Sequence, residues 1–208
     1  MGFVLGLRHA LDADHVVAVS TMVSETQNLG NAARIGGVWG LGHTLSLGVV
    51  GVLVLFSRAV IPPYLEQRAE QLVGLMLVVL GITTLWRLYR RGVGPQPGGA
   101  SVSSRSHHHG RRLGLRPLLV GMVHGLAGSA ALMLVILSTM PSPVVGLLYI
   151  ALFGLGSVVG MVLVSLTIGF PLVVAARLLE RVYHAVVVVV GLSSLSLGTW
   201  LLVGTGLP

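Results

Sequence analysis

Apolar residues fill six stretches of the chain, each long enough to cross a lipid bilayer, which takes about 20 residues of helix. The stretches cover residues 2–23, 35–56, 71–89, 117–140, 143–176 and 182–203. The fifth is too long for one perpendicular helix, so we expect Phe170 and Pro171 to end that span and leave a short interfacial piece. The pattern predicts an all-α polytopic membrane protein with about six transmembrane helices.

One long polar segment separates the third stretch from the fourth. It reads GVGPQPGGASVSSRSHHHGRR, and its Gly, Pro and Ser content predicts a flexible linker over residues 93–115. Residues 1–92 and 116–208 then form two three-helix units. The histidines at 107, 108 and 109 lie among arginines, which oppose metal binding. A variable polar loop is therefore favoured over a transient metal site in this linker.

The two three-helix units resemble each other in sequence. GLRHALDADHVVAV, which begins at Gly6, aligns with GMVHGLAGSAALML and pairs His9 with His124. WGLGHTLSLGVVGVLV aligns with FGLGSVVGMVLVSLTI and pairs Gly42 with Gly156, and VVLGITTL aligns with VVVGLSSL. Because each unit has an odd number of spans, the second copy must lie inverted in the membrane. Inverted repeats are typical of secondary transporters, with the site at the repeat interface near the midplane; the alternative is an old duplication with no role in mechanism.

Composition supports the assignment to the membrane. Hydrophobic residues make up 54% of the chain and charged residues 9%, where soluble domains carry about 25%. So few charges cannot cover a water-facing surface, which excludes soluble enzymes and nucleic-acid-binding modules. The chain has no Cys, which excludes disulfides and thiolate metal sites.

Arginine supplies all 13 positive side chains, and its distribution predicts the orientation. One set of loops and helix ends holds Arg34, Arg87, Arg90, Arg91, Arg105, Arg111, Arg112, Arg116, Arg177 and Arg181. The opposite side holds only Arg8, Arg58 and Arg68. Since cytoplasmic loops carry the excess of Lys and Arg, we expect the 93–115 linker in the cytoplasm and both termini outside, in a bacterial plasma membrane.

The first stretch carries an unusual polar load in the segment RHALDADH. Each ionisable group near the bilayer centre costs a few kcal/mol on insertion scales, so these groups must face the bundle interior and either satisfy one another or bind an ion. On a straight helix His9, Asp12 and His15 share a stripe about 120° wide, while Asp14 lies about 140° away from His9. Asp14 joins the others only if the helix unwinds; otherwise it acts on a neighbouring helix.

Imidazoles beside carboxylates, without thiols, suit a divalent transition metal such as nickel, cobalt, copper or zinc. His43 in the second stretch, and His124 at the position that matches His9 in the repeat, are candidates to complete such a site. The predicted metal ligands are His9, Asp14, His15, His43 and His124, with Asp12 and Arg8 as further ligands or proton-relay groups. The alternative is an interhelical polar network in which Arg8 pairs with an Asp. We expect a structural role for His184 and for the glycine pairs Gly36/Gly40, Gly121/Gly125 and Gly156/Gly160, which favour close helix packing.

The segment RHALDADH, a His-x4-Asp-His pattern in an early transmembrane helix, resembles the signature of the nickel/cobalt transporter family. GLGHTLSLGVV resembles that family's second motif, a Leu-Gly-His-Ser/Thr element in the next helix. The resemblance implies roles in metal selectivity and transport for His9, Asp14 and His15, and extends to His43. Full-length members have eight spans and acidic motifs in their second half, where this chain has VHGLAGSAAL. In that respect the chain is more similar to short six-span members described as urease-accessory or nickel-transport-like proteins.

These observations predict a secondary transporter that carries Ni²⁺ or Co²⁺ through a His/Asp site at the midplane. Protons would compete with the metal, because His is a ligand only when neutral. The alternatives are a transporter of another cation or an anion that uses the first helix as a proton relay, or an accessory protein that delivers nickel. The absence of His-Glu-x-x-His and Gly-x-Ser-x-Gly elements argues against an enzyme. The expected partners are the lipid bilayer, the divalent metal and nickel-enzyme maturation proteins, with no nucleic acid and no prosthetic group.

Overall fold

The computed structural model of the chain describes residues 1–26, 28–57, 62–91, 109–126, 140 and 142–204. Within these residues all regular secondary structure is helical, which confirms the all-α prediction. The helices are α1 (Gly2–His9), α2 (Ala13–Val23), α3 (Leu29–Ser57), α4 (Pro63–Arg91), α5 (His109–Gly125), α7 (Pro143–Leu178) and α8 (Glu180–Gly204).

Four of these helices, α3, α4, α7 and α8, are long and apolar enough to cross a membrane. They correspond to the second, third, fifth and sixth apolar stretches. The first stretch is divided between α1 and α2. The fourth begins in α5, and its residues 127–139 lie outside the described part of the chain. Most of the predicted linker lies outside it as well, although α5 begins within that segment, at His109.

The expectation that Phe170 and Pro171 end a helix is wrong. Helix α7 continues through Pro171 to Leu178. A proline inside a helix removes one N–H donor and crowds the carbonyl four residues earlier. Here the next residue, Leu172, is 3% exposed and belongs to the hydrophobic core. We attribute the continuation of the helix to this packing, which a helix end at Phe170 would disrupt.

The first apolar stretch is interrupted at Ala10–Asp12. The amides of Leu11 and Asp12 donate to carbonyls only three residues back, those of Arg8 and His9. Asp12 then adopts an extended conformation (φ −61°, ψ 144°), and α2 begins at the next residue. Aspartate is among the residues preferred at this position before a helix, and a second acid, Asp14, lies in the first turn, where negative charge is favourable. The sequence LDAD therefore favours a helix start inside the span.

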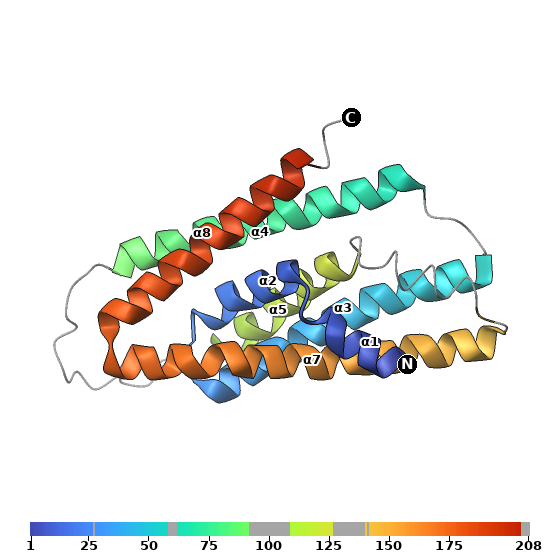
Figure 1. Ribbon diagram of the computed structural model, residues 1–208, viewed down its shortest axis with the longest axis horizontal. Coiled ribbons are helices and arrows are strands. Elements are labelled where there is room, and N and C mark those ends of the chain that lie inside the picture. Colours follow the sequence, from blue (N-terminus) through green and yellow to red (C-terminus); the bar gives the residue numbers. More distant parts are fainter. Residues whose placement is uncertain (27, 58–61, 92–108, 127–139, 141, 205–208) are drawn as a thin grey trace.

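The helices pack in two pairs of long rods with shorter helices between them (Figure 1). Helix α3 packs against α7, and α4 packs against α8. Helix α1 lies on α7, and α5 lies on α3. Helix α2 contacts α3, α4, α7 and α8, so it occupies the centre of the bundle.

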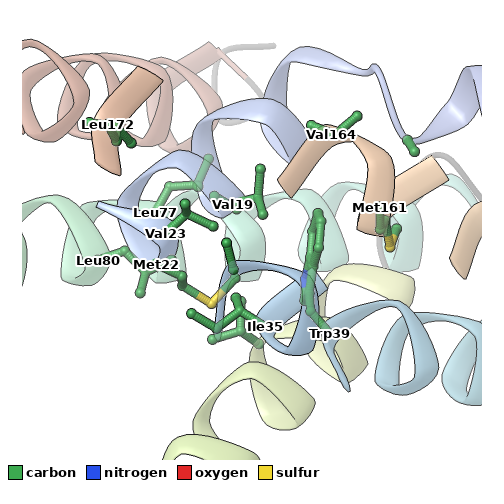
Figure 2. Close-up of a cluster of buried hydrophobic side chains, with 14 of the residues drawn as sticks. Val19, Met22, Val23, Ile35, Trp39, Leu77, Leu80, Met161, Val164 and Leu172 are labelled. Carbon is green, nitrogen blue, oxygen red and sulfur yellow. The ribbon is translucent and has the colours of Figure 1, made fainter. Parts of the chain in front are cut away.

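The main hydrophobic core surrounds α2 (Figure 2). Val19, Met22 and Val23 of α2 are at most 3% exposed, and they belong to the same cluster as Trp39 of α3 and Leu77 of α4. In a bilayer such contacts stabilise helix association through close van der Waals packing, because lipid tails are as apolar as the side chains they replace. This packing holds α2, and with it Asp14 and His15, in a defined place.

Polar contacts hold the other end of α2. Glu25 accepts hydrogen bonds from Arg87 of α4 and from Arg116 of α5, with Arg116 Nη1 2.8 Å from Glu25 Oε2. The Tyr183 hydroxyl of α8 donates to the Ser24 carbonyl at 2.8 Å. Three helices therefore fix the segment that follows α2.

Glycines bring the helix backbones into close contact, as the small-residue pairs predict. A Cβ on Gly121 of α5 would overlap the Trp39 carbonyl of α3, and a Cβ on Gly156 of α7 would overlap the Phe3 carbonyl of α1. Gly36 and Gly160 also lie against groups of neighbouring helices. These positions have the scaffold role expected of them.

Candidate metal centre

Four histidines gather where α1 and α2 meet in the bundle interior. His9 ends α1, His15 lies in the first turn of α2, His43 lies on α3 and His124 on α5. His9 is 8% exposed and the other three are fully buried. The His15 ring lies 4.4 Å from that of His9, 5.1 Å from that of His43 and 4.3 Å from that of His124, measured between centroids. His15 is therefore the central member of the cluster.

Asp12 determines which nitrogen of His9 faces the cluster. Its Oδ2 accepts a hydrogen bond from His9 Nδ1 at 2.8 Å. A proton on Nδ1 leaves Nε2 of the neutral ring with a lone pair. That Nε2 lies 3.2 Å from Nε2 of His43. The carboxylate thus orients His9 from behind, as carboxylates commonly orient metal-binding histidines.

Asp14 does the same for two other rings. One carboxylate oxygen accepts from His15 Nδ1 at 3.1 Å and the other from His124 Nε2 at 2.8 Å. The opposite nitrogens, His15 Nε2 and His124 Nδ1, are buried and have no hydrogen-bond partner within the described residues. A buried polar atom without a partner is costly. These nitrogens are therefore available to a cation.

Two groups of side chains in the cluster have the composition and spacing of metal sites. One consists of His9, His15 and His43, and the other of Asp14, His15 and His124. In each group the ligand atoms lie within 4.8 Å of one another. Ligands at about 2.0–2.2 Å from one ion lie up to about 4 Å apart, so small side-chain adjustments suffice.

All five predicted ligands meet in this cluster, and Asp12 contacts it through His9. The interruption after α1 brings Asp14 to the same place as His9, an arrangement that a straight helix would not allow. Arg8 is exposed and does not join the cluster. His184 is partly exposed and bonds to the Glu180 carbonyl of its own helix. His107 and His108 lie outside the described residues, as does the side chain of His109.

Trp39 is a neighbour of the cluster that the sequence analysis did not single out. Its ring lies 5.3 Å from that of His15 and 5.8 Å from that of His124, and the side chain is fully buried. Trp39 precedes His43 by four residues, a spacing that places both on one helix face. This four-residue spacing is the feature of the sequence that indicates an aromatic ring beside the site.

The chain is similar to known proteins over most of its length. The chain is 35% identical to the "Urease accessory protein UreH" of Bacillus sp. (strain TB-90) over 206 residues, which covers 95% of this chain and 87% of the relative. It is 29% identical to the "Hydrogenase nickel incorporation protein HupN" of Bradyrhizobium diazoefficiens over 104 residues, 44% of this chain and 27% of that protein.

A plant protein is a more distant relative. The "Chloroplast protein FOR GROWTH AND FERTILITY 2" of Arabidopsis thaliana is 25% identical over 166 residues, 77% of this chain and 44% of the relative. No solved structure matches the chain. The profile of the NicO family, described as "High-affinity nickel-transport protein", matches residues 1–179, which include the whole histidine cluster. The chain therefore belongs to the NicO family of nickel-transport proteins.

Proposed function

We propose that this protein is a secondary transporter of Ni²⁺, with Co²⁺ as a second cargo, and that the ion binds at the histidine cluster near the bilayer midplane. The observation that carries the proposal is the convergence of four buried imidazoles and Asp14 at a helix interruption, with ring nitrogens that have no partner among the described residues. Ionisable groups inside a membrane bundle mark ion pathways by default. Interrupted helices are the usual means by which transporters expose such groups to a cargo.

The donor set supports a transition metal over other cargoes. Imidazole favours nickel, cobalt, copper and zinc, whereas magnesium and calcium prefer sites made of oxygen alone. Asp14 offsets part of the charge of the ion. Nickel follows from the family to which the chain belongs and from relatives whose names refer to urease and to nickel incorporation into hydrogenase.

We propose six spans in two inverted repeats, with α1 and α2 as one interrupted span and α5 as the start of the fourth. The helix contacts support this arrangement, because they are preserved when the repeats are exchanged. Helix α1 packs on α7 as its counterpart α5 packs on α3. At residue level, Gly6 lies against the Phe153 carbonyl, and its counterpart Gly121 lies against the carbonyl of Trp39, the counterpart of Phe153.

The first test is nickel uptake by metal-starved cells that express His15→Ala. We expect accumulation of radioactive nickel to fall to the level of cells without the protein, because His15 contacts every other histidine of the cluster. His184→Ala is the matched control, a partly exposed histidine on α8 outside the cluster that should leave uptake unchanged. Normal uptake by His15→Ala at equal expression would refute the proposal.

A second candidate, delivery of nickel to an enzyme without transport, is favoured by the names of two relatives. Reconstitution of the purified protein into lipid vesicles separates the two functions. Entry of nickel into vesicles that contain only this chain supports transport. Nickel binding without entry, at an intact fold and under an imposed proton gradient, supports delivery.

A further inference from the structure

The histidine cluster contains two overlapping groups of potential metal ligands, which we call stations, instead of one set of ligands. The three-histidine station consists of His9, His15 and His43, and the aspartate station consists of Asp14, His15 and His124. His15 belongs to both stations. Its ring stands between the others, with His9 and His124 each within 4.4 Å of it between centroids.

The two stations differ in charge. Three neutral imidazoles hold a divalent ion without neutralising it, whereas the aspartate station supplies one negative charge. Asp14 already bonds to both of its histidines, so it can orient the rings or bind the ion directly. Each station also has a buried nitrogen without a partner in the described residues, His43 Nδ1 in the first and His124 Nδ1 in the second.

The stations also differ in the parts of the fold that build them. The three-histidine station comes from α1, α2 and α3, all in the first repeat. The aspartate station joins α2 to α5, so it spans the two repeats. His124 is the only His, Asp or Glu between residues 117 and 140. Among the described residues of the second repeat, His124 is the only member of either station.

We propose that the two stations form a relay, in which nickel is handed between the three-histidine station and the aspartate station while His15 remains bound. The relay rests on the proposed function and specifies how the ion moves within the site. Because His15 is shared, one ion occupies the cluster at a time. Because the aspartate station joins α2 to α5, a change in the distance between these two helices opens or closes that station.

The test uses purified protein in detergent, loaded with one equivalent of Ni²⁺ and measured by X-ray absorption, which counts bound imidazoles. His124→Asn removes only the aspartate station, and we expect nickel bound by three imidazoles. His43→Asn removes only the three-histidine station, and we expect nickel bound by two imidazoles instead of three. Each variant should bind one ion per chain, yet nickel entry into vesicles should fall at least about tenfold in both.

The control is His184→Asn, which should match the unaltered chain in both binding and entry. If His43→Asn does not fold, His9→Asn removes the same station; if His124→Asn does not fold, Asp14→Asn replaces it. Loss of binding in a folded variant of either station would overturn the relay and indicate a single joint site. Identical spectra for the two variants, or undiminished entry, would also overturn it. Absence of nickel binding by the unaltered chain would instead overturn the proposed function.

Discussion

At the scale of single residues, the cluster depends on groups that need not touch the ion. Asp12 is half exposed, yet its hydrogen bond to His9 Nδ1 leaves the lone pair of that ring on Nε2, which lies 3.2 Å from His43 Nε2. We predict that Asp12→Ala weakens nickel binding about 10–100-fold, the usual cost of removing a carboxylate behind a metal-binding histidine. Calorimetric titration of the purified protein with Ni²⁺ measures the change.

Asp12→Asn separates orientation from charge in this experiment. Its amide oxygen can still accept from His9 Nδ1, so an affinity closer to that of the unaltered chain is expected if orientation is what matters. Equal losses in Asp12→Asn and Asp12→Ala would show that the negative charge is required. An unchanged affinity in Asp12→Ala would contradict the role given to this residue.

The sequence predicted the members of the cluster better than their pairing. Buried charge is so costly in a bilayer that His9, Asp14 and His15 had to face inward. Which of them meet depends on the angle between α1 and α2, whereas a helical wheel treats the whole segment as one straight helix. The wheel separates Asp14 from His9, but the turn at Ala10–Asp12 brings both into one site. Pairing across helices, such as Asp14 with His124, is likewise a property of tertiary packing.

At the scale of helices, glycine positions determine how closely α1 approaches α7. A Cβ on Gly6 would overlap the Phe153 carbonyl, which is backbone and cannot rotate away. We predict that Gly6→Ala pushes α1 off α7 and costs about 1–3 kcal/mol, as overpacking does elsewhere. The melting midpoint in detergent should fall by about 2–4 °C for each kcal/mol.

Gly37→Ala is the matched control for this prediction. The nearest group to a Cβ at Gly37 is Val162 Cγ2 at 3.7 Å, an ordinary contact. Since alanine is the better helix former, we expect no loss of stability. Equal melting midpoints for Gly6→Ala and Gly37→Ala would contradict the assignment of Gly6 to a tight interface.

Helix ends were less predictable than helix positions. Pro171 predicted the end of a helix, but α7 continues through this residue and Leu172 stays packed in the core. Conversely, no proline or glycine marks the interruption after His9, where polar residues and the Asp12 start signal act together. In both cases the position of the helix end depends on local residue preferences together with the burial of side chains in the bundle.

At the scale of the whole molecule, repeat inversion and arginine distribution make separate predictions. If the proposed repeats are inverted, the starts of their third helices, α4 and α8, lie on opposite sides of the membrane. The arginine distribution specifies which side is which: Arg68 stands on the side with few arginines, and Arg181 on the side with many. Because the chain has no Cys, single cysteines can report both.

Gln67→Cys and Leu179→Cys are suitable reporters, because both side chains are exposed and lie within two residues of these arginines. We predict that a membrane-impermeant maleimide modifies Gln67→Cys in intact cells and modifies Leu179→Cys only after the cells are permeabilised. The cysteine-free chain is the blank. Modification of both from the same side would refute the inversion, since equivalent helices would then start on one face. If Leu179→Cys is instead modified in intact cells and Gln67→Cys only after permeabilisation, the inversion stands and only the orientation is overturned. The repeat symmetry requires the two helix starts to lie on opposite sides of the membrane, but only the arginine distribution predicts which side is cytoplasmic.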